Sequence, residues 1–115
     1  MSKTALFVFN GDPMCFIHVL LNALDIDAKG HEARIVIEGA ATQLLPKLIE
    51  AEHPLNQLWN RCLRAGLVAG ACRACANKMG TLEAAKTQQL PLLADMDGHP
   101  AMSTFMAAGY KIITF

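Results

Sequence analysis

The sequence predicts one α/β domain in which a mostly parallel, five-stranded sheet carries helices on both faces. Short apolar runs alternate along the chain with longer segments whose apolar residues recur at helical spacing, and this alternation is typical of parallel sheets. A length of 115 residues suits a single domain over residues 1–115. The hydrophobic fraction of 53% is high, which fits strands buried on both sides or an apolar surface covered by self-association.

The first strand and helix show the pattern clearly. Residues 5–9 read ALFVF, a compact apolar run that Asn10-Gly11-Asp12 ends, as expected for a buried strand and its turn. From Met14 to Ala28 the apolar residues recur every three or four positions, which predicts a helix that Asp12 caps. The chain therefore begins with a β–α unit.

The later elements follow by the same criteria. Further strands are expected over residues 33–39, 67–72 and 110–115. Residues 89–95 predict a fourth strand in chain order, which Pro91 limits to an edge of the sheet or to an irregular pairing. The expected helical segments are residues 41–53 (interrupted by Pro46), 54–66, 73–79, 81–86 and 98–109, the last with Pro100 at its first position.

Charge and composition exclude several classes of function. Ten basic and ten acidic residues balance, so the chain has no electrostatic footprint for nucleic acid or anionic lipid. Its apolar stretches are about half of the roughly 20 residues that a membrane span needs, and its N-terminus does not read as a signal peptide. Four cysteines without an export signal indicate a reducing compartment. We therefore expect a cytoplasmic protein that binds neither nucleic acid nor membrane.

Three segments leave the carboxyl ends of predicted strands, where the sites of doubly wound sheets lie. They are Asn10-Gly11-Asp12, Glu38-Gly39 and residues 71–75. The last segment contains Cys72 and Cys75, so this pair stands where chemistry is expected. Its position is more informative than its C-x-x-C spacing.

Two chemical interpretations of the pair are weak. A structural zinc site needs four ligands, and the other cysteines, Cys15 and Cys62, are isolated in helix patterns. The nearest histidines, His53 and His99, belong to no ligand-spaced motif, so we expect no metal and no cofactor. A thioredoxin-type dithiol also follows a strand and opens a helix, but here the pair follows the third strand and has no aromatic residue just ahead of it.

The third interpretation is a single reactive thiol. Cys72 is expected at the N-cap of a short helix, where unpaired backbone N–H groups stabilise a thiolate. Arg73 and Lys78 add positive charge, so we expect a lowered pKa for Cys72. A thiolate placed in this way is a good nucleophile and a good acceptor for sulfane sulfur.

Other candidate residues have structural explanations. Cys15 and Cys62 fall on apolar helix faces, and we expect them to pack rather than react. Asp12 is expected to cap the first helix and also, because it follows the first strand, to lie near the site. Trp59 is expected to anchor the packing against a neighbouring helix or subunit.

Residues 67–80, LVAGACRACANKMG, resemble the cysteine segment of the DsrE/DsrF-like proteins. There a strand runs into a cysteine, a short helix and a glycine eight residues after that cysteine, and Cys72 and Gly80 have this separation. The opening KTALFVFNGDP, the segment GHEARIVIEGAA and the closing AAGYKIITF extend the resemblance over the whole chain.

The resemblance implies a flavodoxin-like, three-layer domain that assembles as a homo-oligomer, such as a trimer or hexamer. It also implies sulfur relay in the cytoplasm, in which the cysteine that matches Cys72 holds a persulfide and exchanges sulfur with donor and acceptor proteins. Cys75 is absent from the sulfur-relay members. Persulfide resolution, a reversible disulfide and simple packing therefore stay open as its role.

We thus expect a sulfur carrier or sulfurtransferase-like protein. Cys72 and Cys75 are its predicted reactive residues, and Asn10, Asp12 and Arg73 are predicted to line the site. Two alternatives remain: a non-enzymatic oligomeric module that binds a small molecule or a protein, and a redox dithiol of the two cysteines.

Overall fold

The computed structural model describes residues 1–115 and contains one five-stranded sheet in which every strand pairing is parallel. The strands lie in the order β4-β3-β2-β1-β5. Their bounds are β1 (Lys3–Val8), β2 (Glu32–Ile37), β3 (Val68–Cys72), β4 (Leu92–Leu93) and β5 (Lys111–Thr114). The predicted α/β fold is confirmed.

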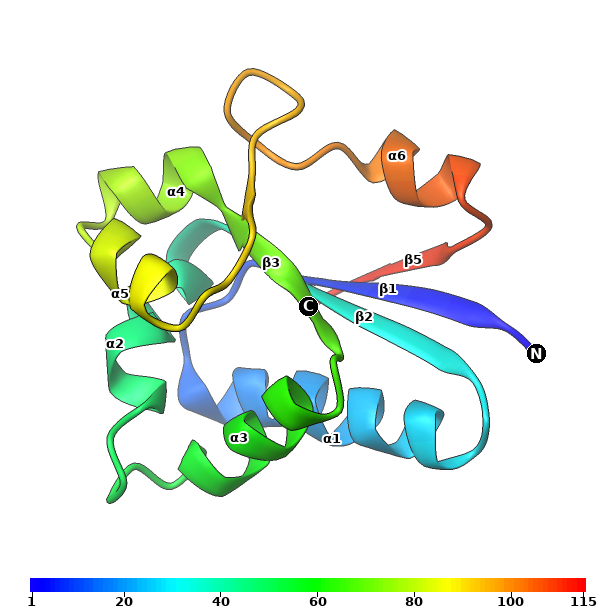
Figure 1. Cartoon of the computed structure of the whole chain (residues 1–115), viewed down its shortest axis with the longest axis horizontal. Coiled ribbons are helices and arrows are strands. Elements are labelled where there is room, and N and C mark those ends of the chain that lie inside the picture. The colour runs from blue at the N-terminus through cyan, green and yellow to red at the C-terminus, as the bar shows by residue number, and fades with distance from the viewer.

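Helices cover both faces of the sheet, and Figure 1 shows α1 and α3 on one side with α6 on the other. The chain adds β2, β3 and β4 in one direction and then returns to place β5 beside β1. Because crossover connections are right-handed, the returning connection with α6 must pass over the opposite face. None of the helices combines the length and apolar character needed to cross a bilayer. The helices are α1 (Pro13–Ala28), the 3₁₀ helix η1 (Gly39–Leu44), α2 (Leu45–Leu48), α3 (Asn56–Arg64), α4 (Arg73–Lys78), α5 (Leu82–Thr87) and α6 (Met102–Ala107).

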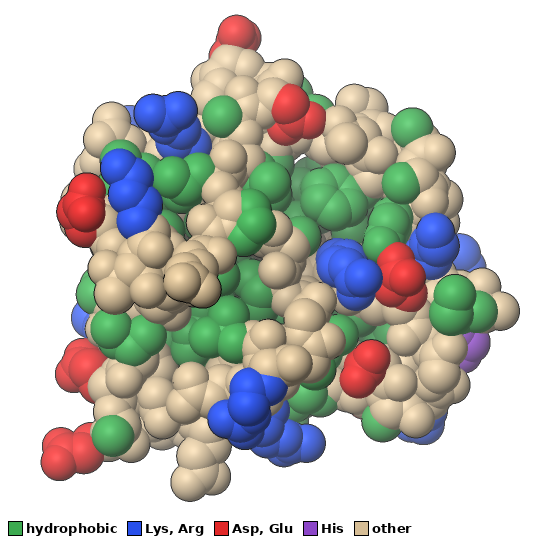
Figure 2. Space-filling model, viewed as in Figure 1, with side chains coloured by type: hydrophobic (Ala, Val, Ile, Leu, Met, Phe, Trp, Pro, Cys, Tyr) green, Lys and Arg blue, Asp and Glu red, His purple; other side chains and the backbone are tan.

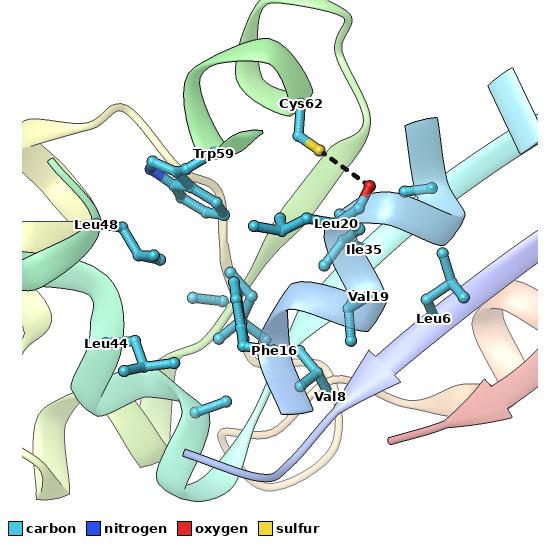
Figure 3. Close-up of a cluster of buried hydrophobic side chains, with 14 of the residues drawn as sticks. Leu6, Val8, Phe16, Val19, Leu20, Ile35, Leu44, Leu48, Trp59 and Cys62 are labelled. Atoms are coloured by element: carbon cyan, nitrogen blue, oxygen red, sulfur yellow. Dashed lines mark hydrogen bonds between the residues drawn. The ribbon is translucent and has the colours of Figure 1, made fainter. Parts of the chain in front are cut away.

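The main core lies between the sheet and helices α1 and α3. Phe16 and Trp59 are fully buried there with ring centroids 6.1 Å apart, which confirms that Trp59 anchors helix packing. The indole N–H of Trp59 donates to Oε1 of Gln88 at 2.8 Å, so its polar atom is also satisfied. Figure 3 shows Cys62 pointing into this cluster, where its Sγ donates to the carbonyl of Leu20 at 3.7 Å. Cys62 packs in the core, as predicted.

The opposite face of the sheet has a much smaller core. Its buried residues are Ala5, Phe7 and Val36, and α6 contributes no fully buried side chain. Phe105 of α6 packs edge-on against Phe7 with ring centroids 5.4 Å apart. Because side chains alternate along each strand, half of them point to the main core and half to this second face, which α6 covers only thinly.

Three prolines mark element boundaries. Pro46 lies in the first turn of α2 directly after η1, so the helical segment is divided there as predicted, but it ends at Leu48 and the predicted extent to residue 53 is wrong. Pro100 precedes α6, which begins at Met102 after an Ala101 cap, so the predicted helix start at Pro100 is also wrong. Pro91 precedes β4, which lies at an edge of the sheet as expected but covers only Leu92–Leu93 of the predicted residues 89–95.

Gly70 allows β3 and β4 to approach each other closely. A Cβ at this position would lie 2.4 Å from the carbonyl oxygen of Pro91 and 3.0 Å from Cγ of Leu93. The N–H of Ala71 donates to the same carbonyl at 3.0 Å. Because Cys72 follows and is paired in register with Leu93, this close approach helps to fix the position of Cys72.

We predict that Gly70→Ala destabilises the domain by about 1–3 kcal/mol, because the added methyl group overpacks the contact between β3 and β4. Urea unfolding followed by circular dichroism measures this loss. An unchanged free energy of unfolding would show that the strands do not approach in this way.

Candidate functional site

The register of the sheet places Glu38 and Cys72 side by side. Ile37 pairs with Ala71 in the parallel ladder, so the next residue of each strand reaches the carboxyl edge of the sheet at the same level. Ile37 and Ala71 belong to the main core. Because side chains alternate along a strand, Glu38 and Cys72 project towards the thinly covered face.

Cys72 ends β3 and caps α4. Its backbone is extended, and its Sγ accepts a hydrogen bond from the backbone N–H of Cys75 at 3.3 Å. This is the contact that a serine or aspartate oxygen makes at other helix N-termini. The predicted N-cap position is confirmed.

His99 reaches the site from the connection between β4 and α6. Met96 and His99 exchange backbone hydrogen bonds of 2.8 and 2.9 Å around Asp97 and Gly98. These two central residues have φ values of 50° and 88°, as a two-residue type I′ turn requires. The backbone N–H of Ala74 donates to the carbonyl of Gly98 at 2.9 Å, which anchors the turn to the first turn of α4.

Asp95 holds the connection on the other side of this turn. Its carboxylate accepts hydrogen bonds from the hydroxyl of Thr104 at 2.7 Å and from the backbone N–H of Ala101 at 3.0 Å. The Thr104 hydroxyl and then the Ala101 N–H hold the pKa of Asp95 below its ordinary value. The segment that carries His99 is therefore tied to α4 and to α6.

These elements gather Glu38, Cys72, Cys75 and His99 into one cluster, which we call the cysteine–histidine site. Nδ1 of His99 lies 3.1 Å from Sγ of Cys72 and 3.7 Å from Sγ of Cys75. One nitrogen, oxygen or sulfur atom from each of the four residues lies within 4.8 Å of all the others. Glu38 and Cys72 are buried, whereas Cys75 and His99 are half-buried. The site therefore meets solvent on its Cys75–His99 side.

The pKa of Cys72 is raised to about 12, and the prediction of a lowered pKa is wrong. Burial is the largest cause, and Cys72 is 0% exposed. The Cys75 side chain and the charge of Glu38 raise the pKa further, while the Cys75 backbone N–H lowers it. Arg73 and Lys78 are exposed to solvent. Cys72 therefore rests as a thiol, and a base must remove its proton before it can act as a nucleophile.

Glu38 is a second buried ionisable group in the site. Burial raises the pKa of its carboxyl group, and the nearby His99 opposes that shift. A carboxylate in this position gains from a neighbouring cation.

Two of the three predicted binding residues, Asn10 and Asp12, use side-chain oxygens in local hydrogen bonds. Oδ1 of Asn10 accepts from the backbone N–H of Asp12 at 2.8 Å, and Asp12 accepts from the N–H of Met14 at 2.9 Å. The predicted cap of α1 by Asp12 is thereby confirmed. Arg73 is exposed beside the site, in an open pocket of about 400 Å³ that Gly98 also lines. A binding role for these three residues stays a prediction.

A second open pocket adjoins the buried side of the site. It has a volume of about 370 Å³, and Glu38 is its acidic member. Phe9, Met96 and Pro100 contribute apolar surface to it. The Glu38 carboxyl group therefore lies between the cysteines and an apolar hollow.

Sequence reasoning missed two members of the site. It placed Glu38 at the end of a strand without a role, and it set His99 aside because no ligand spacing surrounds it. The available signal was Asp97-Gly98, a dipeptide typical of two-residue turns, which indicates a hairpin presenting the residue after it. His53, the other histidine considered, accepts a hydrogen bond from the backbone N–H of Leu55 at 3.1 Å in its own turn.

The chain resembles known proteins over nearly its whole length. The model of the DsrE/DsrF-like family matches residues 3–115. The chain belongs to the DsrE/DsrF-like family. Membership suggests sulfur relay at the level of the family, and it agrees with the fold that the resemblance implied.

The relatives match this chain over different lengths. An uncharacterised protein of Methanocaldococcus jannaschii is 32% identical over 97 residues, which cover 84% of this chain and 77% of the relative. An uncharacterised protein of Archaeoglobus fulgidus is 42% identical over 48 residues, which cover 42% of this chain and 79% of that protein. A solved structure of a conserved protein of unknown function from Bacteroides thetaiotaomicron superposes with a TM-score of 0.69 at 16% identity, covering 99% of this chain and 95% of that one. This last likeness shows the fold.

The buried core thiol predicts how stability depends on pH. Burial raises the pKa of Cys62 from 9.0 to about 11. Above pH 9 the unfolded chain loses this proton while the folded chain keeps it, so the free energy of unfolding must fall as pH rises towards 11, by about 2–3 kcal/mol from this group. Cys62→Ala should make the fall shallower, as urea unfolding at several pH values would show.

Cys15→Ala is the matched control, because Cys15 is a half-buried helix cysteine outside the core cluster. It should keep the wild-type pH dependence. Equal slopes in Cys62→Ala and wild type would contradict the raised pKa.

Proposed function

We propose that this protein is a cytoplasmic sulfur carrier that holds sulfane sulfur as a persulfide on Cys72, with His99 as the base that activates the thiol. The observation that supports this most is the 3.1 Å separation between Sγ of Cys72 and Nδ1 of His99. Family membership adds support, because it suggests sulfur relay.

The chemistry begins with a proton transfer. His99 accepts the thiol proton at Nδ1, and the backbone N–H of Cys75 stabilises the resulting thiolate. The thiolate attacks the terminal sulfur of a donor persulfide, so a new S–S bond forms on Cys72 as the donor S–S bond breaks. The donor leaves as a thiolate and takes up a proton, which His99 can return. The pKa of Cys72 is high, so the thiol keeps its proton at rest. Because His99 lies within hydrogen-bond reach, the proton can move to it during the attack, and no thiolate is needed beforehand.

Cys75 lies where it can release the sulfur that Cys72 holds, which leaves a Cys72–Cys75 disulfide that an external thiol reductant must reduce before the next loading. Its sulfur also lies against His99, at 3.7 Å from Nδ1. Attack of the Cys75 thiolate on the inner sulfur of the Cys72 persulfide would form a Cys72–Cys75 disulfide and release hydrosulfide. The same proximity favours the redox dithiol as a second candidate function, which would need no sulfur donor.

The burial of Cys72 restricts how sulfur enters. Cys75 and His99 are the partly exposed members of the site, so the donor approaches from their side. This is the reverse of a thioredoxin-type pair, in which the first cysteine is the exposed one. The donor must therefore reach Cys72 past Cys75, while the Ala74–Gly98 hydrogen bond keeps the turn that carries His99 in place.

We also propose self-association through the thinly covered face of the sheet, as a trimer or hexamer. Figure 2, viewed with the β3–β4 edge of the sheet nearest the viewer, shows hydrophobic side chains near the centre of this side of the molecule and most charged side chains farther out. Met96 is 53% exposed and Met106 is 62% exposed in this part of the chain. Zero net charge at neutral pH also favours association between copies. Light scattering after size-exclusion chromatography gives the mass in solution, and a monomer would contradict this part of the proposal.

Incubation with a small-molecule persulfide donor followed by intact-mass analysis tests sulfur loading. Wild-type protein should gain one sulfur atom on Cys72, and Cys72→Ser should gain none there. His99→Gln should slow loading by about 100-fold or more, because it removes the general base and keeps a similar volume.

Cys75→Ser and Cys15→Ser separate the alternatives. Cys75→Ser should still load one sulfur and then fail to release it as hydrosulfide, whereas Cys15→Ser should behave as wild type. Equal sulfur uptake by Cys72→Ser and wild type would overturn the proposal, and so would a disulfide that cycles without any sulfur adduct.

A further inference from the structure

The cysteine–histidine site joins residue types that together bind a metal ion. Two cysteine sulfurs, an imidazole nitrogen and a carboxylate oxygen converge from three separate segments of the chain. Cys72 and Cys75 come from the β3–α4 junction, Glu38 from the end of β2, and His99 from the turn before α6. Each segment is held by backbone hydrogen bonds, so the donor set exists in the folded chain before anything binds.

The separations suit a small tetrahedral ion. An ion about 2.3 Å from sulfur and about 2.0 Å from nitrogen sets tetrahedral sulfur and nitrogen ligands about 3.5 Å apart. The distances from Nδ1 of His99 are 3.1 Å to Cys72 and 3.7 Å to Cys75, on either side of that value. The widest separation in the set is within 4.8 Å, so a modest contraction closes the shell.

We propose that Glu38, Cys72, Cys75 and His99 form a tetrahedral Zn²⁺ site. Thiolate and imidazole ligands favour Zn²⁺ over Mg²⁺ and Ca²⁺, which require oxygen ligands. The ion also supplies the buried Glu38 carboxylate with a cation. This inference reverses the expectation from sequence spacing, which could not see that His99 and Glu38 meet the cysteine pair.

Binding replaces two S–H bonds by two metal–sulfur bonds and releases both protons to the buffer, with no change of oxidation state. The Zn²⁺ site goes beyond the proposed sulfur carriage and does not rest on it. The two uses are mutually exclusive, because a metal-bound Cys72 sulfur is not free to attack a persulfide. Zn²⁺ would therefore hold the thiols in a protected state from which a chelator releases them.

Titration of the reduced, chelator-treated protein with Co²⁺, and then with Zn²⁺, tests the site. Co²⁺ should give thiolate-to-cobalt charge-transfer absorption and the intense visible bands of a tetrahedral ion, saturating at one ion per chain. Zn²⁺ should abolish both signals. His99→Ala and Glu38→Gln should each weaken Co²⁺ binding at least about tenfold, and Cys75→Ser should lower the charge-transfer intensity.

Cys15→Ser and His53→Ala are the matched controls, and both should bind Co²⁺ as wild type does. Sulfur loading measured on the same chelator-treated wild-type protein distinguishes the two proposals, because sulfur uptake without Co²⁺ binding would remove the metal site alone. Circular dichroism checks that each variant is folded. Absence of charge-transfer absorption in the wild type would overturn the Zn²⁺ site, as would unchanged Co²⁺ affinity in both His99→Ala and Glu38→Gln.

Discussion

The contact between the Cys72 sulfur and the His99 ring depends on how the β4–α6 connection crosses the end of the sheet. The parallel register of β2 and β3 brings Glu38 and Cys72 to one level at the carboxyl edge. The returning connection must then pass over the face to which they point, because it runs back across the sheet to β5. The turn at Asp97-Gly98 and the Ala74–Gly98 hydrogen bond fix the position of this connection relative to α4. The site is thus a consequence of topology as much as of the cysteine motif.

Burial gives the site a reactivity different from that of an exposed thiolate. Removal of Cys72 from water raises its pKa to about 12, which outweighs the stabilising N–H of Cys75. The thiol is therefore inert until a base or a metal ion takes its proton. His99 can be that base in sulfur transfer, and Zn²⁺ can displace the proton in the protected state. Both roles rest on the same short separations, so one arrangement supports a reactive and a resting form.

Sequence reasoning recovered the elements and the edge of the sheet where the site lies. Asp12 capping α1, Cys72 capping α4, Trp59 anchoring α3 and the edge position of β4 all follow from local patterns that the structure confirms. Local patterns failed where distant segments meet. The pKa of Cys72 depends on burial by the whole fold. His99 lies 24 residues beyond Cys75, so the spacing of these residues in the sequence does not indicate that they meet.

The central claim is that the His99 ring lies against the two thiols, and NMR of the imidazole nitrogens tests it most directly. In reduced, metal-free protein the Nδ1 resonance of His99 should shift on Cys72→Ser and again on Cys75→Ser, because both sulfurs contact that atom. It should stay in place on Cys15→Ser, and His53 should be unaffected by all three changes. A His99 Nδ1 resonance that is the same in wild type and in Cys72→Ser would contradict the account.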